Sequence, residues 1–275
     1  GAVMGGGDAA KRSRRAPSPP SEPRGTPAAT ETNAGEASTP NSGYLGSFEI
    51  APASASGVPA PGELFEVNHP LQVGFDEIDS KAIRERLGSS PIVKFEPATR
   101  TLNTERMLAR LPKGYTPKVP AGLLVWADAS PQGSPPAVLW PALDQLGMIA
   151  IGAANVGNDR SVVERLQLAL DAVHTAKRRW HIDPERIYVA GISGGAKVAS
   201  ILNAAYPEVI RGAVVIVGIS FYENIPTGTG NQVWGSEFSK PTGTRWALFR
   251  SHRLAVVSGE KDFNYPRIAA TIAPM

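Results

Sequence analysis

Hydrophobic residues recur with two different periods from about residue 63 onward. Continuous apolar runs at 123–126 (LLVW) and 148–153 (MIAIGA) are typical of strands that are covered on both faces. Between residues 161 and 180, apolar side chains recur at steps of three and four, which predicts one long amphipathic helix. Ser161 and Glu164 have the spacing of a capping box at the start of that helix.

The same alternation continues to the end of the sequence. Further strands are predicted at 105–111, 186–190, 213–219 and 254–258, and a further helix at 196–205. Strands that alternate with helices indicate the α/β class, with a mostly parallel sheet that carries helices on both faces.

Residues 1–62 differ from this pattern because Ala, Pro, Ser, Thr and Gly dominate them. Such a segment buries too little apolar area to offset the entropy of ordering it, so we predict a disordered tail or linker before a domain at 63–275. A spacer of this composition favours export, to the periplasm or outside the cell, although the sequence contains no signal peptide.

Composition narrows the possible functions. The 275 residues include no cysteine, which excludes disulfides, thiolate metal sites and a cysteine nucleophile. A net charge of +3 is too small to indicate nucleic-acid binding, and the longest apolar runs are too short for a transmembrane span. No His, Asp or Glu cluster has ligand spacing, so neither a metal nor a cofactor is expected. The sequence does not indicate an oligomeric state.

The residues 191–195 (GISGG) fit the pattern G-x-S-x-G between a predicted strand and a predicted helix. In that setting, a tight strained turn presents Ser193 as a nucleophile above the carboxyl edge of the sheet. The backbone N–H of Gly194 and the positive end of the helix dipole would then stabilise an oxyanion. The alternative is a glycine-rich turn whose serine only caps the helix.

A phosphate-binding loop is a competing interpretation of the same residues. Gly191 and Lys197 have the spacing of the pattern G-x-x-x-x-G-K-[ST]. However, Ala196 stands where the second glycine belongs, and Val198 replaces the hydroxyl that would bind magnesium. The nucleophile turn is therefore the better interpretation.

Other polar residues follow the predicted strands. Asp262 comes directly after the last strand and is the candidate for the acid that orients a histidine, with the nearby Glu260 as an alternative. Asp262 could instead have only a structural role, as an aspartate that caps a helix or stabilises a turn. The loop after strand 123–126 offers Ala129, or Asp128, as a second oxyanion donor. Asn155 and Tyr222 are candidates for substrate binding.

The general base is harder to assign. In the chain order of α/β hydrolases the histidine follows the acid, and none of the last thirteen residues is a histidine. All the histidines lie upstream of Asp262, and none of them is a good candidate for the base. They are His69, His174, His181 and His252.

Several blocks resemble secreted serine esterases of the polyhydroxybutyrate-depolymerase-like α/β hydrolases. These blocks are 155–160 (NVGNDR), 182–189 (IDPERIYV), 191–195 (GISGG), 206–207 (YP), 211–213 (RGA) and 259–264 (GEKDFN). The resemblance implies Ser193 as nucleophile, Asp262 as acid, and a final strand and histidine some tens of residues beyond Asp262. Because the sequence stops at Met275, we expect it to be a fragment of a longer reading frame.

The sequence therefore predicts a serine hydrolase that cleaves carboxylic esters, small or polymeric, through an acyl-enzyme on Ser193. The same groups cleave amides, so a serine peptidase stays open. A catalytically inactive binding module of the same fold is the other alternative.

Overall fold

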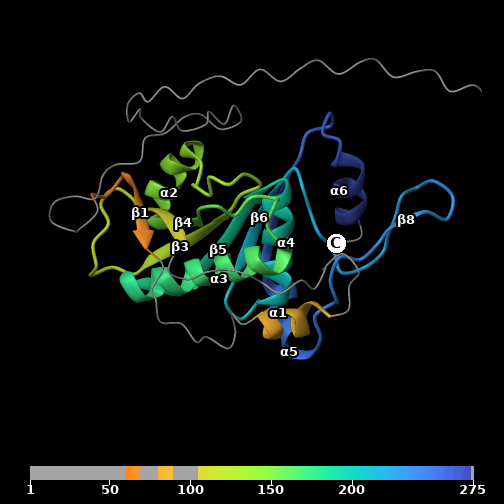
Figure 1. Cartoon of the computed structure of the whole chain (residues 1–275), viewed down its shortest axis with the longest axis horizontal. Coiled ribbons are helices and arrows are strands. Elements are labelled where there is room, and N and C mark those ends of the chain that lie inside the picture. Colours follow the sequence, from red (N-terminus) through yellow and green to blue (C-terminus); the bar gives the residue numbers. More distant parts are fainter. Residues whose placement is uncertain (1–59, 69–79, 89–104, 274–275) are drawn as a thin grey trace, which may run out of the picture. The chain divides into compact units, whose positions relative to one another are not determined.

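Seven strands form the central sheet in the order β1-β2-β4-β3-β5-β6-β9 (Figure 1). The computed structural model describes residues 60–68, 80–88 and 105–273, so most of the predicted tail and His69 lie outside the described residues. β1 is antiparallel to β2 and β2 to β4, whereas all other neighbours are parallel. The strands are β1 (Leu64–Asn68), β2 (Arg106–Arg110), β3 (Ala121–Ala127), β4 (Met148–Ala153), β5 (Ile182–Ile192), β6 (Gly212–Ile216) and β9 (Arg253–Val257).

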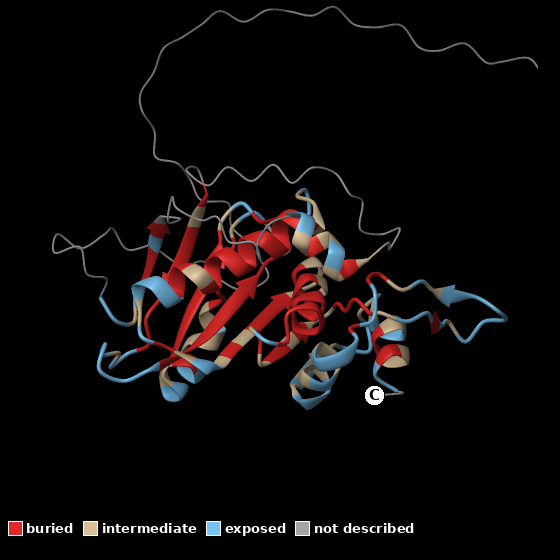
Figure 2. Cartoon of the chain, turned by 90° about the horizontal axis from the view of Figure 1, so that it is seen from below, coloured by how far each residue is buried: buried red, intermediate tan, exposed pale blue. Residues whose placement is uncertain are grey.

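Helices connect the parallel strands, and a short hairpin follows β6. The helices are α1 (Ser80–Leu87), α2 (Trp140–Leu146), α3 (Val162–Arg179), α4 (Gly194–Ala205), α5 (Gly243–Ser251) and α6 (Tyr265–Ile272), with a 3₁₀ turn at Ala137–Leu139. The hairpin consists of β7 (Ile225–Pro226) and β8 (Val233–Trp234), and much of it is exposed (Figure 2). The mostly parallel α/β sheet predicted from the sequence is confirmed.

Strand β3 shows how the two faces of the sheet are filled. Because successive side chains point to opposite faces, Leu123 and Val125 join the larger core cluster with residues of α3 and α4. Leu124 and Trp126 join a second cluster on the other face, with Leu143 of α2. Every residue of β3 is buried, and the central strands are the most continuously buried part of the sheet (Figure 2).

The long helix forms where the periodicity predicts it. Ser161 Oγ accepts a hydrogen bond from the Glu164 backbone N–H (3.2 Å), and the Glu164 carboxylate accepts one from the Ser161 N–H (3.0 Å). This capping box satisfies two amides that the first turn would leave without partners.

Two boundaries differ from the sequence-based prediction by more than two residues. The strand predicted at 213–219 ends at Ile216 because Val217 adopts a left-handed conformation (φ 49°) that turns the chain out of the sheet. Strand β5 begins at Ile182 rather than at residue 186, and a register shift opposite β3 accommodates Asp183 and Pro184.

No helix in the described ranges is long and apolar enough to cross a bilayer. The same ranges contain no group of three or more His, Asp or Glu side chains arranged to hold a metal ion.

Candidate active site

Ser193 occupies the turn between β5 and α4 in a strained conformation (φ 52°, ψ −117°). Its N–H donates to the carbonyl of Ile216 on the neighbouring strand (2.8 Å). Its side chain makes no capping hydrogen bond to α4. The helix-cap alternative is therefore not what the structure shows, and the hydroxyl is left available for chemistry.

Two glycines of the motif allow this turn to pack against β3. A Cβ on Gly195 would lie 1.9 Å from the carbonyl oxygen of Ala127, and one on Gly191 would lie 2.5 Å from the backbone of Gly195. Neither position has room for a side chain. The pattern G-x-S-x-G thus has a physical basis here, because the helix can approach the strand end only through glycine.

Backbone strain gathers around the same edge of the sheet. The three described non-glycine residues with positive φ are Asn155 after β4, Ser193 after β5 and Val217 after β6. For the β-branched Val217 this conformation is especially costly. Gly218 packs directly on the serine turn, because a Cβ there would lie 2.4 Å from the Ser193 carbonyl oxygen. Strain of this kind, about 1–3 kcal/mol for each residue, is typical of functional sites.

A pocket of about 340 Å³ opens beside Ser193. Its lining combines the serine turn, the start of α3, the first turns of α4 and the segment after β9. The residues are Asn158, Val162, Arg165, Ser193, Gly194, Lys197, Val198, Ile201, Ser220, Glu237, Phe263 and Asn264. The backbone N–H of Gly194 lies in the first turn of α4 and has no intrahelical partner, so it is a suitable oxyanion donor.

Asp262 lies in the turn after β9, at the same edge of the sheet as Ser193. Its carboxylate accepts hydrogen bonds from Ser258 Oγ (2.9 Å) and from the Asn264 N–H (3.1 Å). Asp262 and Glu260 do not line the pocket, whereas Phe263 and Asn264 do. Asn264 Nδ2 also donates to the Val217 carbonyl (3.0 Å), which ties the aspartate turn to the segment beneath Ser193.

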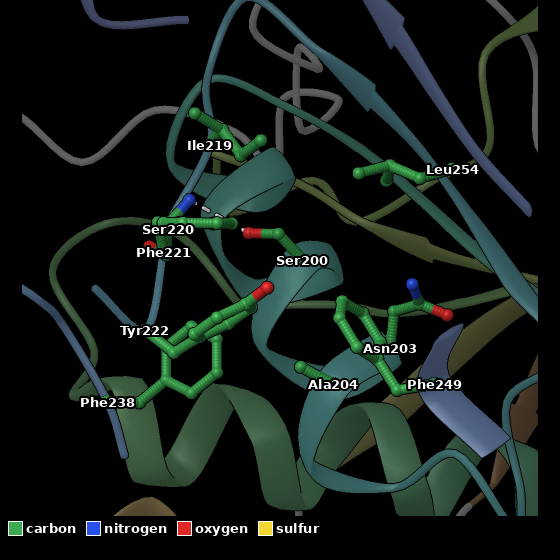
Figure 3. A pocket seen from close by; sticks show the side chains of 10 residues that line it. All are labelled: Ser200, Asn203, Ala204, Ile219, Ser220, Phe221, Tyr222, Phe238, Phe249 and Leu254. Atoms are coloured by element: carbon green, nitrogen blue, oxygen red, sulfur yellow. Dashed lines mark hydrogen bonds between the residues drawn. The ribbon is translucent and has the colours of Figure 1, made fainter. Parts of the chain in front are cut away.

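The structure does not bring the two predicted substrate-binding residues to this pocket. Asn155 is exposed, and Asn158 from the same loop lines the pocket instead. Tyr222 lies in an aromatic cluster beyond Ser220, with its ring 4.2 Å from that of Phe221 and 6.0 Å from that of Phe238 (Figure 3). Burial and the nearby Glu223 raise the pKa of Tyr222, so its hydroxyl stays protonated.

The loop after β3 carries the proposed second oxyanion donor and is held from several sides. Asp128 is buried, and its carboxylate accepts hydrogen bonds from Trp126 Nε1 (3.1 Å) and the Ser130 N–H (2.9 Å). The Ala129 carbonyl accepts one from the Asn158 N–H (3.0 Å). Ala129 itself is half-buried and does not line the pocket described above.

Arg165 is a residue of the pocket that the sequence analysis missed. It is only 5% exposed, and it donates to the Asp128 carbonyl (2.6 Å) and to Asn158 Oδ1 (3.0 Å). Burial lowers its pKa to about 10, against the opposing effect of Asp128 and Asp159, so the guanidinium is still charged at neutral pH. Within the described residues no carboxylate pairs with it directly. A buried cation thus joins two loops of the site.

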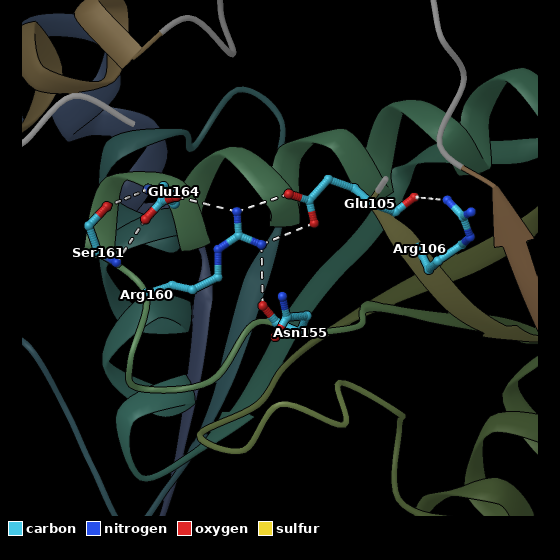
Figure 4. Close-up of polar contacts among 6 residues, drawn as sticks. All are labelled: Glu105, Arg106, Asn155, Arg160, Ser161 and Glu164. Carbon is cyan, nitrogen blue, oxygen red and sulfur yellow. Dashed lines mark hydrogen bonds and ion pairs between the residues drawn. The ribbon is translucent and has the colours of Figure 1, made fainter. Parts of the chain in front are cut away.

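A second arginine fixes the loop after β4 (Figure 4). Arg160 makes a bidentate ion pair with Glu105 (2.9 and 3.0 Å), contacts Glu164 (3.3 Å) and donates to the Asn155 carbonyl (3.3 Å). Although burial acts to lower the pKa of Arg160, the two carboxylates raise it overall. This network anchors the strained loop that presents Asn158.

Lys197 and Glu237 add charge to the pocket wall. Glu237 is 4% exposed and receives Lys197 Nζ at 3.5 Å and an Arg267 guanidinium nitrogen at 2.9 Å. In the sequence, Lys197 was notable only for its spacing in the phosphate-loop pattern, whereas in the structure it pairs with the Glu237 carboxylate.

None of the described histidines lines the pocket. His174 lies on α3, His181 Nδ1 is 3.1 Å from the Pro117 carbonyl, and His252 ends α5 at the opposite edge of the sheet. His69 lies outside the described residues.

The strand order, the strained turn at Ser193 between β5 and α4, and the position of Asp262 after β9 are consistent with an α/β-hydrolase fold. Residues 147–233 match the family model described as Esterase PHB depolymerase. The chain is thus similar to α/β-hydrolase esterases of the polyhydroxybutyrate-depolymerase type.

Individual relatives agree with this similarity. The chain is 25% identical over 172 residues to an acetylxylan esterase of Coprinopsis cinerea, covering 60% of this chain and 42% of that protein. It is 44% identical over 46 residues to poly(3-hydroxyalkanoate) depolymerase C of Paucimonas lemoignei, covering 17% and 11% respectively. The chain therefore spans less than half the length of these curated relatives. Among solved structures, S-formylglutathione hydrolase of Staphylococcus aureus aligns with a TM-score of 0.43 at 10% identity, covering 68% of this chain and 82% of that one.

Proposed function

We propose that the protein is a serine hydrolase that cleaves carboxylic esters through an acyl-enzyme on Ser193. The observation that carries this proposal is the conformation of Ser193, held at φ 52° at the wall of a pocket with its hydroxyl not used as a helix cap. A serine that only joined a strand to a helix would have no need of this strain.

Each remaining role follows from position. The Gly194 N–H and the α4 dipole would stabilise the oxyanion of the tetrahedral intermediate, with a second donor from Ala129. Asp262, already held by Ser258 and Asn264, would orient a histidine. That histidine would take the proton from Ser193 and return it to the leaving alcohol, and we place it in a part of the protein outside the described residues.

The test is hydrolysis of p-nitrophenyl acetate and butyrate by the full gene product, including whatever the gene encodes beyond residue 275. Ser193→Ala should lower kcat at least roughly 10³-fold, and Asp262→Asn by roughly 10²–10⁴-fold. Ser251→Ala, on the surface of α5, is the matched control and should leave the rate unchanged. A fluorophosphonate probe should add its mass to the wild type and not to Ser193→Ala.

Two outcomes would contradict the proposal. The first is hydrolysis that Ser193→Ala leaves intact. The second is a complete reading frame that supplies no histidine and shows neither turnover nor labelling, which would favour a catalytically inactive binding module. Parallel assays on p-nitroanilide amides separate an esterase from a peptidase.

A further inference from the structure

A second cavity, of about 750 Å³, lies between α4, α5, α6 and β9. It shares no lining residue with the pocket beside Ser193. Asn203, which contributes to its wall, follows Ser193 by ten residues along α4, a separation of about 15 Å. Its volume falls within the range of pockets that bind small molecules. Any ligand here would occupy a site separate from the proposed catalytic one.

Aromatic rings form one wall of this cavity. The Tyr222 ring meets Trp246 (5.6 Å, 82°) and Phe249 (5.9 Å, 88°) edge to face, and Trp246 and Phe249 lie 5.8 Å apart. All three side chains are only half-buried and line the cavity, so part of their apolar surface remains available. Such an arrangement suits a further aromatic ring, which can continue the edge-to-face or offset packing.

Two buried polar atoms at the cavity have no hydrogen-bond partner among the described residues. They are Asn203 Oδ1, on a residue that is 1% exposed, and His252 Nδ1. Figure 3 shows the Asn203 amide on the same side as Phe249 and Leu254, in a small adjoining pocket of about 10 Å³ that shares these three residues with the cavity. Leaving such an atom unpaired costs about 1–3 kcal/mol, so a ligand that donates a hydrogen bond to it would recover this loss.

Positive charge lies at the rim. Lys240 Nζ is 4.5 Å from the centre of the Trp246 ring and pairs with Glu223 (2.6 Å). Arg250 lies 5.9 Å from the same ring and makes no ion pair within the described ranges. Burial and the nearby Arg211 lower the pKa of His252, so its imidazole is neutral at pH 7. Among the described residues that line the cavity, the one unneutralised charge is therefore the Arg250 cation, which favours an anion.

We infer that this cavity binds a planar aromatic acid that carries a hydroxyl group. The ring packs against Tyr222 and Trp246, the hydroxyl donates to Asn203 Oδ1, and the carboxylate lies near Arg250. The inference is independent of the proposed esterase activity, because it uses no residue of the serine pocket.

The experiment titrates the protein with 4-hydroxybenzoate while following tryptophan fluorescence and ligand-detected saturation-transfer NMR. Benzoate, which lacks the hydroxyl, and 4-hydroxybenzyl alcohol, which lacks the charge, are the matched probes. The expected Kd for 4-hydroxybenzoate is about 1 mM or tighter, given its size. Benzoate should bind several-fold more weakly.

Variants identify the site. Asn203→Leu should weaken 4-hydroxybenzoate about tenfold and benzoate little, and a thermal melt establishes that this variant folds. Arg250→Gln, on the surface of α5, cannot disturb the core and should weaken both acids but not the alcohol. Ser193→Ala should change nothing, which separates this site from the catalytic one.

Three results would overturn the inference. They are an absence of saturable binding by the wild type up to about 10 mM, equal binding of all three probes, and binding that Ser193→Ala abolishes while Asn203→Leu leaves it intact.

Discussion

Replacing Arg165 by methionine tests whether the buried cation organises the site or only fills space. The change removes two hydrogen bonds from a charged donor, to the Asp128 carbonyl and to Asn158 Oδ1. At about 1.5–3 kcal/mol each, their gross loss is about 3–6 kcal/mol. Methionine has a similar side-chain volume, although its chain ends where Nε of the arginine stands, so at most a small cavity should add to this loss.

Desolvation acts in the opposite direction. The lowering of the Arg165 pKa to about 10 corresponds to a net effect of about 3 kcal/mol against the charged form, in which burial outweighs the attraction of Asp128 and Asp159. An apolar side chain is released from that penalty. The two effects nearly cancel, so Arg165→Met should change the free energy of unfolding by only about 0–3 kcal/mol.

The loops should nevertheless loosen. Hydrogen exchange measured by mass spectrometry should speed up in peptides that cover 128–131 and 155–160, while the rest of α3 keeps its protection. Ester hydrolysis should fall about 10–100-fold through kcat, since the loop after β3, proposed to carry the second oxyanion donor, is no longer fixed. Arg165→Lys keeps the charge but not both hydrogen bonds, so its rate of ester hydrolysis and its exchange in these loops should lie between those of the wild type and of Arg165→Met. Unchanged exchange in both loops, or a loss of stability above about 5 kcal/mol, would refute this account.

Three further changes test the fold. Gly195→Ala should destabilise the protein by about 3 kcal/mol or more in urea titrations, because its Cβ would lie 1.9 Å from the Ala127 carbonyl oxygen, whereas Gly235→Ala, with open space around it, should be neutral. Asp144→Asn should lower the free energy of unfolding by about 3 kcal/mol, because it breaks the bidentate pair with Arg110, a side chain that is 1% exposed. Equal free energies of unfolding for the variant and the wild type would contradict this. The Arg110 hydrogen bonds lower the pKa of Asp144, so its stabilisation is present above about pH 3.9 and is lost as the pH falls through the lowered folded value, an acid dependence that Asp144→Asn should not show. Val217→Gly should be neutral or stabilise by up to about 1 kcal/mol, whereas the same change at Val214 in β6 should destabilise.

The strands and the serine turn were predictable because their signals are local. Apolar runs of four to six residues, the capping box at Ser161 and the glycines around Ser193 each depend on residues close in sequence. The charged residues of α3 show where this approach fails. A stripe of apolar positions predicts that the remaining positions face water, yet Glu164, Arg165 and Asp171 are all buried. The loops after β3 and β4 contact Glu164 and Arg165 at the start of this helix, and the contact with Asp128, distant in sequence, leaves no periodic signal.

Tyr222 shows the complementary failure. Its position just past a strand end suggested the pocket beside Ser193, because loops at the carboxyl edge usually surround the site. The strand actually ends at Ile216, and the segment that follows passes Ser220 at the pocket before it reaches Tyr222. Within the irregular segment 217–222, the chain therefore passes from the pocket beside Ser193 to the second cavity, where Tyr222 lies. Only the structure, through α5 and its Trp246 and Phe249, shows where the tyrosine packs.

The strain at Ser193 has to be balanced by contacts outside the motif, and these lead to the turn that carries Asp262. The Ser193 N–H bonds to the end of β6, and Gly218 packs on the Ser193 carbonyl. Val217 is held in turn by its N–H bond to the Val257 carbonyl (2.8 Å) and by the Asn264 amide. Asn264 lies two residues after Asp262 and donates to its carboxylate. A change that disorders the segment after β9 should therefore disturb Ser193, the proposed nucleophile, as well as Asp262, the proposed acid, so the two proposed roles cannot be separated by loosening that turn.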